Sequence, residues 1–172
     1  MGAGVLIGQK KPELKDVIGQ YVIFRGSVST TVTDSSAHSI TLDTIAKATS
    51  NISNYVGLVN GDILLNPGIY TIGGKIQITS NTENVAIYSF WRKDTDQASL
   101  DLSSASSDVD AQMGESYLFI PAGASQAKTI INPTTVEITE PTYVRIGYHL
   151  SSANTSMVIA ENACRVQITK LK

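Results

Sequence analysis

The stretch NPGIYTIGGKIQI, residues 66–78, decides how the rest of the sequence is interpreted. Its Pro67-Gly68 pair predicts a type II turn, because proline presets φ at the second turn position and glycine accepts a positive φ at the third. Apolar residues then recur at every second position, which predicts a half-buried antiparallel strand. The predicted core face consists of Tyr70, Ile72, Gly74, Ile76 and Ile78.

Two adjacent glycines, Gly73 and Gly74, interrupt this predicted strand. Glycine inside a strand marks a bulge, a bend or a close approach of another part of the backbone. All three interpretations stay open at the level of sequence. The strand context argues against a phosphate-binding loop, because such a loop leads into a helix.

The composition predicts a single all-β domain. Charged residues make up only 16% of the 172 residues, and Ser, Thr, Asn and Gly take their place, as in turn-rich β proteins. The formal charge of −2 argues against a nucleic-acid partner, which requires clustered Lys and Arg. No apolar run reaches the ~20 residues of a membrane-spanning helix, so no membrane partner is expected. Cys164 is the single cysteine and is expected to be a small core residue.

Short strands separated by turn residues surround the opening stretch, and Asn60-Gly61 is a second turn signal. The segment NVAIYSFWR at 84–92 differs from the other strands because both of its faces are apolar. One face carries Val85, Ile87 and Trp91, and the other carries Ala86, Tyr88 and Phe90. In a two-layer sandwich only one face of a strand meets the core. We expect a partner subunit to cover the other face.

Residues 1–19 are predicted to form an N-terminal attachment arm, separate from the domain at 20–172. The arm combines an apolar run with five charged residues, and it is too short to bury that run by itself. A free tail has little use for such a run, so we expect the arm to dock on another protein. Its candidate contact residues are Val5, Leu6, Ile7, Lys10, Lys11, Leu14 and Val17.

The order of the predicted strands resembles the ten-stranded antiparallel jelly-roll β-sandwich of tumour necrosis factor and the complement globular head. Three features carry the resemblance: the Pro67-Gly68-x-Tyr70 turn into a long strand, the double-faced strand at 85–91, and the strand at 143–150 that precedes the C-terminal strand. Proteins of that family are homotrimers whose inner sheets meet at a three-fold axis. The resemblance therefore implies a homotrimer. Its expected interface includes Tyr88, Phe90, Tyr143, Arg145 and His149.

The chain shows no collagen-like stalk, membrane anchor or disulfide, so the roles of the animal proteins are not expected. It is similar instead to the jelly rolls of bacteriophage head fibres and capsid decoration proteins. That resemblance implies a virion structural protein, made in the host cytoplasm and bound on the capsid exterior through its arm to the major capsid protein or another virion component. The alternative is a carbohydrate- or receptor-binding tip of a phage fibre, which would bind a cell-surface glycan through Trp91 and the segment 93–116.

Neither an enzyme nor a cofactor site is expected. His38 and His149 are the only histidines, and the spacings typical of nucleophilic, zinc-dependent or nucleotide-binding sites are absent. The pairs Asp94/Asp96 and Asp108/Asp110 offer oxygen ligands of the kind that calcium prefers, but they lack the spacing of a calcium loop and are expected to face solvent. Trp91 is expected in the core or in an interface rather than under a sugar.

Overall fold

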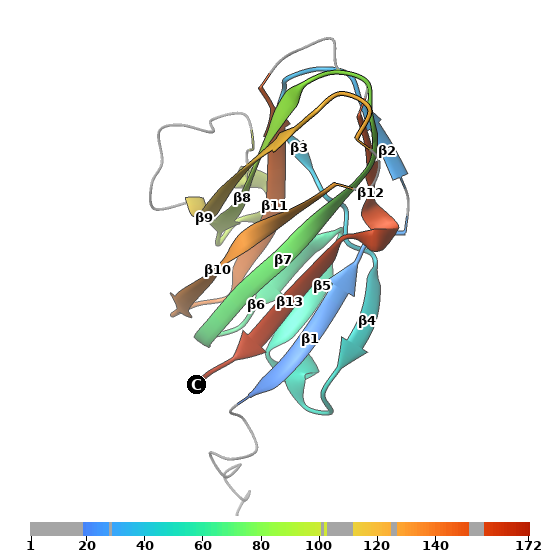
Figure 1. Cartoon of the computed structure of the whole chain (residues 1–172). Coiled ribbons are helices and arrows are strands. Elements are labelled where there is room, and N and C mark those ends of the chain that lie inside the picture. The colour runs from blue at the N-terminus through green and yellow to red at the C-terminus, as the bar shows by residue number, and fades with distance from the viewer. Residues whose placement is uncertain (1–18, 28, 101, 103–111, 125–126, 152–156) are drawn as a thin grey trace, which may run out of the picture.

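The computed structural model of the protein describes residues 19–27, 29–100, 102, 112–124, 127–151 and 157–172. Two antiparallel sheets pack face to face as a jelly-roll sandwich (Figure 1), which confirms the predicted all-β fold class. These residues form thirteen strands rather than ten, because short segments such as β3 (His38–Ser39) also pair. No helix within the same ranges is long and apolar enough to cross a membrane.

The first sheet faces the viewer in Figure 1 and has the strand order β2-β12-β7-β13-β1-β4, with β10 paired to β7. Its strands are β1 (Gln20–Arg25), β2 (Ser29–Val32), β4 (Thr44–Ala48), β7 (Gly68–Asn81), β10 (Lys128–Ile138), β12 (Met157–Ala160) and β13 (Arg165–Lys170). The fourteen-residue β7 organises this sheet. It pairs with β10 along one edge and with β13 and then β12 along the other.

The second sheet lies behind the first and has the order β5-β6-β11-β8-β9, with β3 paired to β11. Its remaining strands are β5 (Val56–Val59), β6 (Asp62–Leu65), β8 (Val85–Asp94), β9 (Gln112–Ile120) and β11 (Thr142–Leu150). In the described ranges, strands are also connected by the single-turn 3₁₀ helices η2 (Ile52–Asn54), η3 (Gln97–Ser99) and η4 (Glu161–Ala163).

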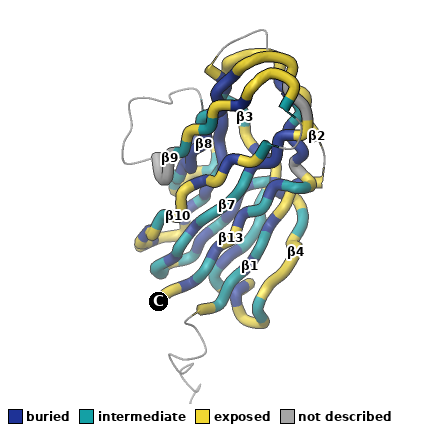
Figure 2. Tube along the Cα trace, viewed as in Figure 1, coloured by how far each residue is buried: buried dark blue, intermediate teal, exposed yellow. Residues whose placement is uncertain are grey.

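The opening stretch of the sequence forms the centre of the core, as predicted. On β7 the core-facing side chains are fully buried, and Figure 2 shows buried positions alternating with less buried ones along β7 and β13. Gly74 marks a close approach: a Cβ there would lie 2.9 Å from the Arg165 carbonyl oxygen and 3.6 Å from the Trp91 ring. The backbone carbonyl of Arg165 on the neighbouring strand therefore occupies the space that a side chain at 74 would need, and the Trp91 indole packs beside it. The paired strand β10 has a register shift opposite these glycines, between Ile131 and Thr134.

The two predicted turns have different outcomes. The prediction of a type II turn at Pro67-Gly68 is wrong, because Gly68 has an extended φ of 158° and begins β7. The reason is topological: β6 belongs to the second sheet and β7 to the first, so the chain crosses between sheets here instead of folding back. The Asn60-Gly61 turn is confirmed, since both residues have positive φ (49° and 90°) and join β5 to β6 as a tight hairpin.

Candidate functional site

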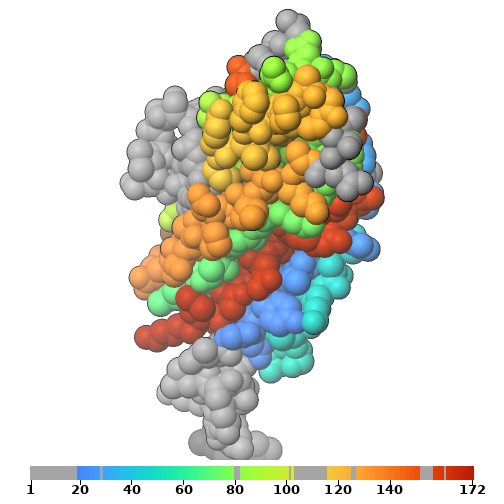
Figure 3. All heavy atoms as spheres, in the orientation of Figure 1, coloured from blue at the N-terminus to red at the C-terminus, as the bar shows by residue number. Residues whose placement is uncertain are grey.

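An open trough of about 660 Å³ crosses the outer face of the first sheet, which is the face seen in Figure 3. Five neighbouring strands contribute to it: β10, β7, β13, β1 and β4. Its lining residues are Ile23, Ala46, Thr71, Gly73, Gly74, Lys75, Ile130, Pro133, Arg165, Gln167 and Thr169.

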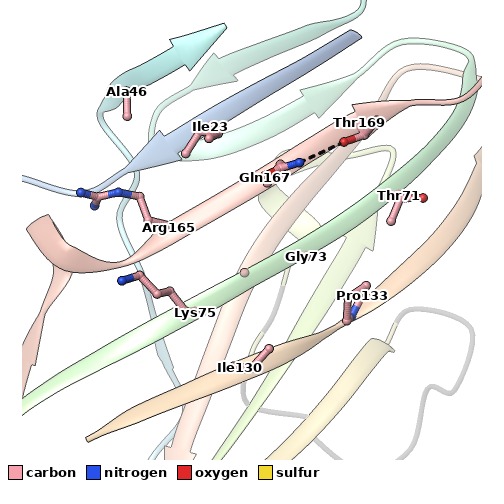
Figure 4. A pocket seen from close by; sticks show the side chains of 11 residues that line it. Ile23, Ala46, Thr71, Gly73, Lys75, Ile130, Pro133, Arg165, Gln167 and Thr169 are labelled. Atoms are coloured by element: carbon pink, nitrogen blue, oxygen red, sulfur yellow. Dashed lines mark hydrogen bonds between the residues drawn. The ribbon is translucent and has the colours of Figure 1, made fainter. Parts of the chain in front are cut away.

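The walls of the trough are apolar, and glycine leaves part of its floor as bare backbone. Ile130 and Pro133 of β10 form one wall (Figure 4), and 66% of the Ile130 side chain is exposed. Ile23 and Ala46 line the opposite side. Between them lies Gly73, where a Cβ would be only 3.6 Å from the Pro133 ring. Exposed apolar surface that gathers around a hollow, rather than lying scattered, is typical of an interaction site.

The two ends of the trough differ in polarity. Arg165 and Lys75 lie at one end on adjacent strands, as Figure 4 shows. The other end is neutral: the Gln167 amide donates to the Thr169 hydroxyl (3.4 Å), and the Thr71 and Thr135 hydroxyls are 3.3 Å apart. An apolar centre with polar ends has the same arrangement as the apolar core and polar rim of protein–protein interfaces.

Three of the predicted interface residues lie on the second sheet, on the opposite side of the sandwich from the trough. Tyr88 of β8 and His149 of β11 are cross-strand partners, and their half-buried rings stack with centroids 4.7 Å apart at 8°. Tyr143 is also half-buried on β11. Their proposed contact with another subunit stays a prediction.

The other two predicted interface residues, Phe90 and Arg145, make their contacts within the chain. Phe90 is 1% exposed, because its ring lies over Gly147 with Leu102 beside it. Arg145 donates from Nε and Nη2 to the two carboxylate oxygens of Asp62, each at 2.7 Å. That hydrogen-bonded ion pair raises the pKa of Arg145. The cover that the sequence assigned to a partner is thus provided for Phe90 by the chain itself.

Sequence reasoning missed an aromatic patch on β9. Tyr117 and Phe119 are 58% and 54% exposed, and the Tyr117 ring lies 5.1 Å from that of Tyr88. In SYLFI, the aromatic pair alternates with the apolar pair Leu118 and Ile120. Either pair suits a core, so the alternation alone did not reveal which pair faces outward.

The two carboxylate pairs considered as calcium ligands, Asp94/Asp96 and Asp108/Asp110, differ in what the structure describes. Asp96 caps η3, since its carboxylate accepts from the Ala98 amide (3.0 Å) and the Ser99 hydroxyl (3.1 Å), and Asp94 accepts from the Asp96 amide (2.9 Å). Within the described ranges, no group of three or more His, Cys, Asp or Glu side chains is placed to hold a metal ion. The pair Asp108/Asp110 and all the candidate arm residues, Val5 to Val17, lie outside those ranges.

His38 belongs to an exposed cluster with Asp34 and Ser36. The carboxylate (2.9 Å) and the hydroxyl (3.3 Å) both contact the same ring nitrogen, Nε2. A nucleophile–base pair requires the orienting carboxylate and the nucleophile on different ring nitrogens. The hydrogen bonds from Ser36 lower the pKa of Asp34. This cluster therefore stabilises the β2–β3 connection rather than activating Ser36.

Trp91 is fully buried in the core cluster, and so is Cys164. The core interpretation of both residues is confirmed. Because the Trp91 ring has no exposed face, it does not form the sugar-stacking platform of the alternative hypothesis.

The chain was compared with protein-family models, curated proteins and solved structures. No protein-family model matches the chain, and no curated protein matches it. Among solved structures, murine APRIL at pH 5.0 is similar with a TM-score of 0.61 and 6% identity, over 89% of this chain and 99% of that one. Eiger TNF from S. frugiperda is similar with a TM-score of 0.58 and 9% identity, over 90% and 94%. Identities this low establish fold alone, and that fold is a tumour-necrosis-factor-like jelly roll.

Proposed function

We propose that this chain is a structural protein of a bacteriophage virion: a homotrimeric jelly roll that decorates the capsid exterior and is attached through its N-terminal arm. It is made in the host cytoplasm and binds the major capsid protein or another virion component. The apolar and charged composition of residues 1–19 and the Ser-, Thr- and Asn-rich sequence support this proposal. Three arms on one trimer would multiply a weak contact through avidity.

The single observation that supports the proposed self-association is the trough on the first sheet. Its apolar walls, with Ile130 two-thirds exposed, remain in water in a single chain. Covering apolar surface contributes roughly 25 cal/mol per Å², and a second copy of the chain is the partner always present at equal concentration. We therefore assign the subunit contact to the first sheet, since Phe90 and Arg145 are engaged within the chain.

Light scattering coupled to size-exclusion chromatography tests the assembly. The expected result is a particle of about three times the 18.4-kDa chain mass at micromolar concentration. Within the trough, Ile130→Asp should shift that mass toward the monomer, because it places a charge in the proposed contact. The matched substitution Ile45→Asp, at a side chain 59% exposed on β4 and not among the trough residues, should leave the mass unchanged. A stable wild-type monomer would contradict the proposal.

Co-sedimentation with capsids that lack the protein tests the arm. The full chain should sediment with them, and a variant that lacks residues 1–19 should stay in the supernatant while keeping its mass in light scattering. If the truncated trimer binds capsids as well as the full chain does, the arm is not the anchor.

The aromatic patch on β9 favours a second candidate, a receptor- or carbohydrate-binding tip. Tyr117 and Phe119 have the exposed rings that Trp91 lacks. Glycan-array binding by the full chain that is lost in Tyr117→Ala and retained in Ile45→Ala would favour this second function over capsid decoration.

A further inference from the structure

A row of cations crosses the first sheet at one end of the trough. The β7–β13 register places Lys75 directly opposite Arg165. Arg25 follows Phe24, which pairs with Val166, so it lies next to Arg165 on the other side. We call Arg25, Arg165 and Lys75 the cationic row.

The cationic row is unfavourable in an isolated chain. Like charges directly opposite each other on neighbouring strands destabilise a sheet. Arg165 donates from Nη1 only to the carbonyl oxygens of Asn162 and Cys164, both at 2.7 Å. In the described part of the chain, no carboxylate lies within ion-pair distance of any member of the row. A row of like charges that has no compensating ion pair is typical of a functional surface.

The outer face of this sheet carries more positive than negative side chains. The chain as a whole has more acidic than basic residues, with a formal charge of −2. On the described strands β1, β4, β7, β10 and β13, however, the carboxylate that points outward is Glu137, and the outward cations outnumber it. These cations are Arg25, Lys47, Lys75, Lys128 and Arg165.

This charge distribution decides how two copies can meet. Two identical cationic faces placed against each other repel, so a symmetric face-to-face dimer through the trough is unfavourable. A contact between this face and a different, acidic surface of the next copy is favourable, and such head-to-tail contacts close into rings. Covering the row without anions would leave desolvated, unpaired charges, which costs several kcal/mol.

We infer that the trough is occupied by a carboxylate-bearing surface of a second copy of this chain, and that ion pairs to Arg25, Lys75 and Arg165 fix the register of the subunits. This inference rests on the proposed homotrimer and specifies its contact. The apolar walls provide most of the affinity, and the cationic row selects the acidic surface over a like face.

Sedimentation velocity of the full chain at low and high NaCl tests the inference. The wild type should form trimers that dissociate at least tenfold more readily at 0.5 M than at 0.05 M salt, because screening weakens the ion pairs. The double variant Lys75→Glu/Arg165→Glu should be monomeric at concentrations where the wild type is trimeric. Lys93→Glu, at a half-exposed lysine of the second sheet, makes the same kind of charge change away from the trough and should assemble normally.

A second variant separates assembly from folding. Lys75→Met keeps the apolar stem and removes the like-charge repulsion, so the monomer should unfold at an equal or higher temperature while the trimer weakens. A merely structural role of Lys75 predicts no change in assembly.

The outcomes distinguish this inference from the proposed function. A wild-type monomer at every salt concentration would remove the homotrimer and the inference with it. Trimers that withstand salt and both glutamate substitutions would leave the homotrimer intact and overturn the ionic register. If those trimers lost only their binding to capsids, the row would belong to an acidic capsid surface, and the inference would again be wrong.

Discussion

The packing of the Phe90 ring against Gly147 in the second sheet can be tested by substitution at both positions. A Cβ added at Gly147 would overlap the Phe90 ring and lie 3.0 Å from the Leu102 side chain. Normal carbon contacts are about 3.5–4.0 Å, so in Gly147→Ala the ring must retreat by roughly 1 Å. Because Phe90 is 1% exposed, it has no open space to enter. Overpacking of this kind costs about 2–3 kcal/mol of unfolding free energy.

The double variant Phe90→Ala/Gly147→Ala tests whether the two residues are in direct contact. Phe90→Ala alone should cost about 3–4 kcal/mol through the cavity that it leaves. In Phe90→Ala/Gly147→Ala the overlap disappears, and the new methyl group fills part of that cavity. The pair should therefore cost about 3–4 kcal/mol in total, which is about 2–3 kcal/mol less than the sum of the single variants.

Equilibrium unfolding in urea measures these values, and the fluorescence of Trp91, the single tryptophan, reports on the core because that side chain is fully buried. All variants are compared at one protein concentration, since the stability of an oligomer depends on concentration. Gly57→Ala is the control: its Cβ would meet only the Leu64 Cβ, at 3.9 Å, so the change should stay within about 0.5 kcal/mol. Additive costs for Phe90 and Gly147 would refute the packing described here.

Three further predictions concern buried groups. Arg145→Met should cost about 3 kcal/mol in urea unfolding, because it leaves the Asp62 carboxylate, 3% exposed, without its bidentate partner; a loss below about 1 kcal/mol would show that the pair is not needed. Gly74→Ala should cost about 2 kcal/mol or more and Gly73→Ala much less, since the added Cβ at 74 meets a backbone carbonyl at 2.9 Å and the one at 73 meets a proline ring at 3.6 Å; equal costs would contradict this. Burial raises the pKa of Tyr70 to about 12, above the unfolded value near 10, so its contribution to stability is intact below pH 10 and is lost as pH rises through 12. Unfolding of the wild type and Tyr70→Phe from pH 9 to 12 should show their difference shrinking by up to about 3 kcal/mol, and a constant difference would be evidence against the shifted pKa.

Alternation in the sequence was sufficient to predict the core face of β7, because a strand has only two faces and Tyr70, Ile72, Ile76 and Ile78 all lie on one of them. The same reasoning failed at Pro67-Gly68. Turn chemistry reports local backbone preference, but the sheet to which the next strand belongs depends on the whole topology. Local signals succeed where the partner strand is adjacent in sequence, as at the Asn60-Gly61 hairpin.

The double-faced strand β8 shows where pattern reasoning reaches its limit. The sequence correctly indicated that both faces need cover, but periodicity does not name the source of that cover. For Phe90 it is Leu102, twelve residues further along the chain, together with Gly147 of the neighbouring β11. The absence of a side chain at Gly147 is what leaves room for the ring, and a strand glycine has many other causes.

The trough could not be predicted from the sequence, for a related reason. Its residues come from five strands spread over nearly the whole chain, and each of them looks ordinary in its own segment. Lys75, Arg165 and Arg25 are isolated cations in the sequence, and only the antiparallel register brings them into one row. Like charges opposite each other on neighbouring strands do not favour the stability of the single chain. Because the row lies on the same face as the exposed apolar walls, we expect that face to bind an acidic partner surface. If it does, assembly must weaken as the salt concentration rises; if no acidic partner binds there, assembly should not depend on salt.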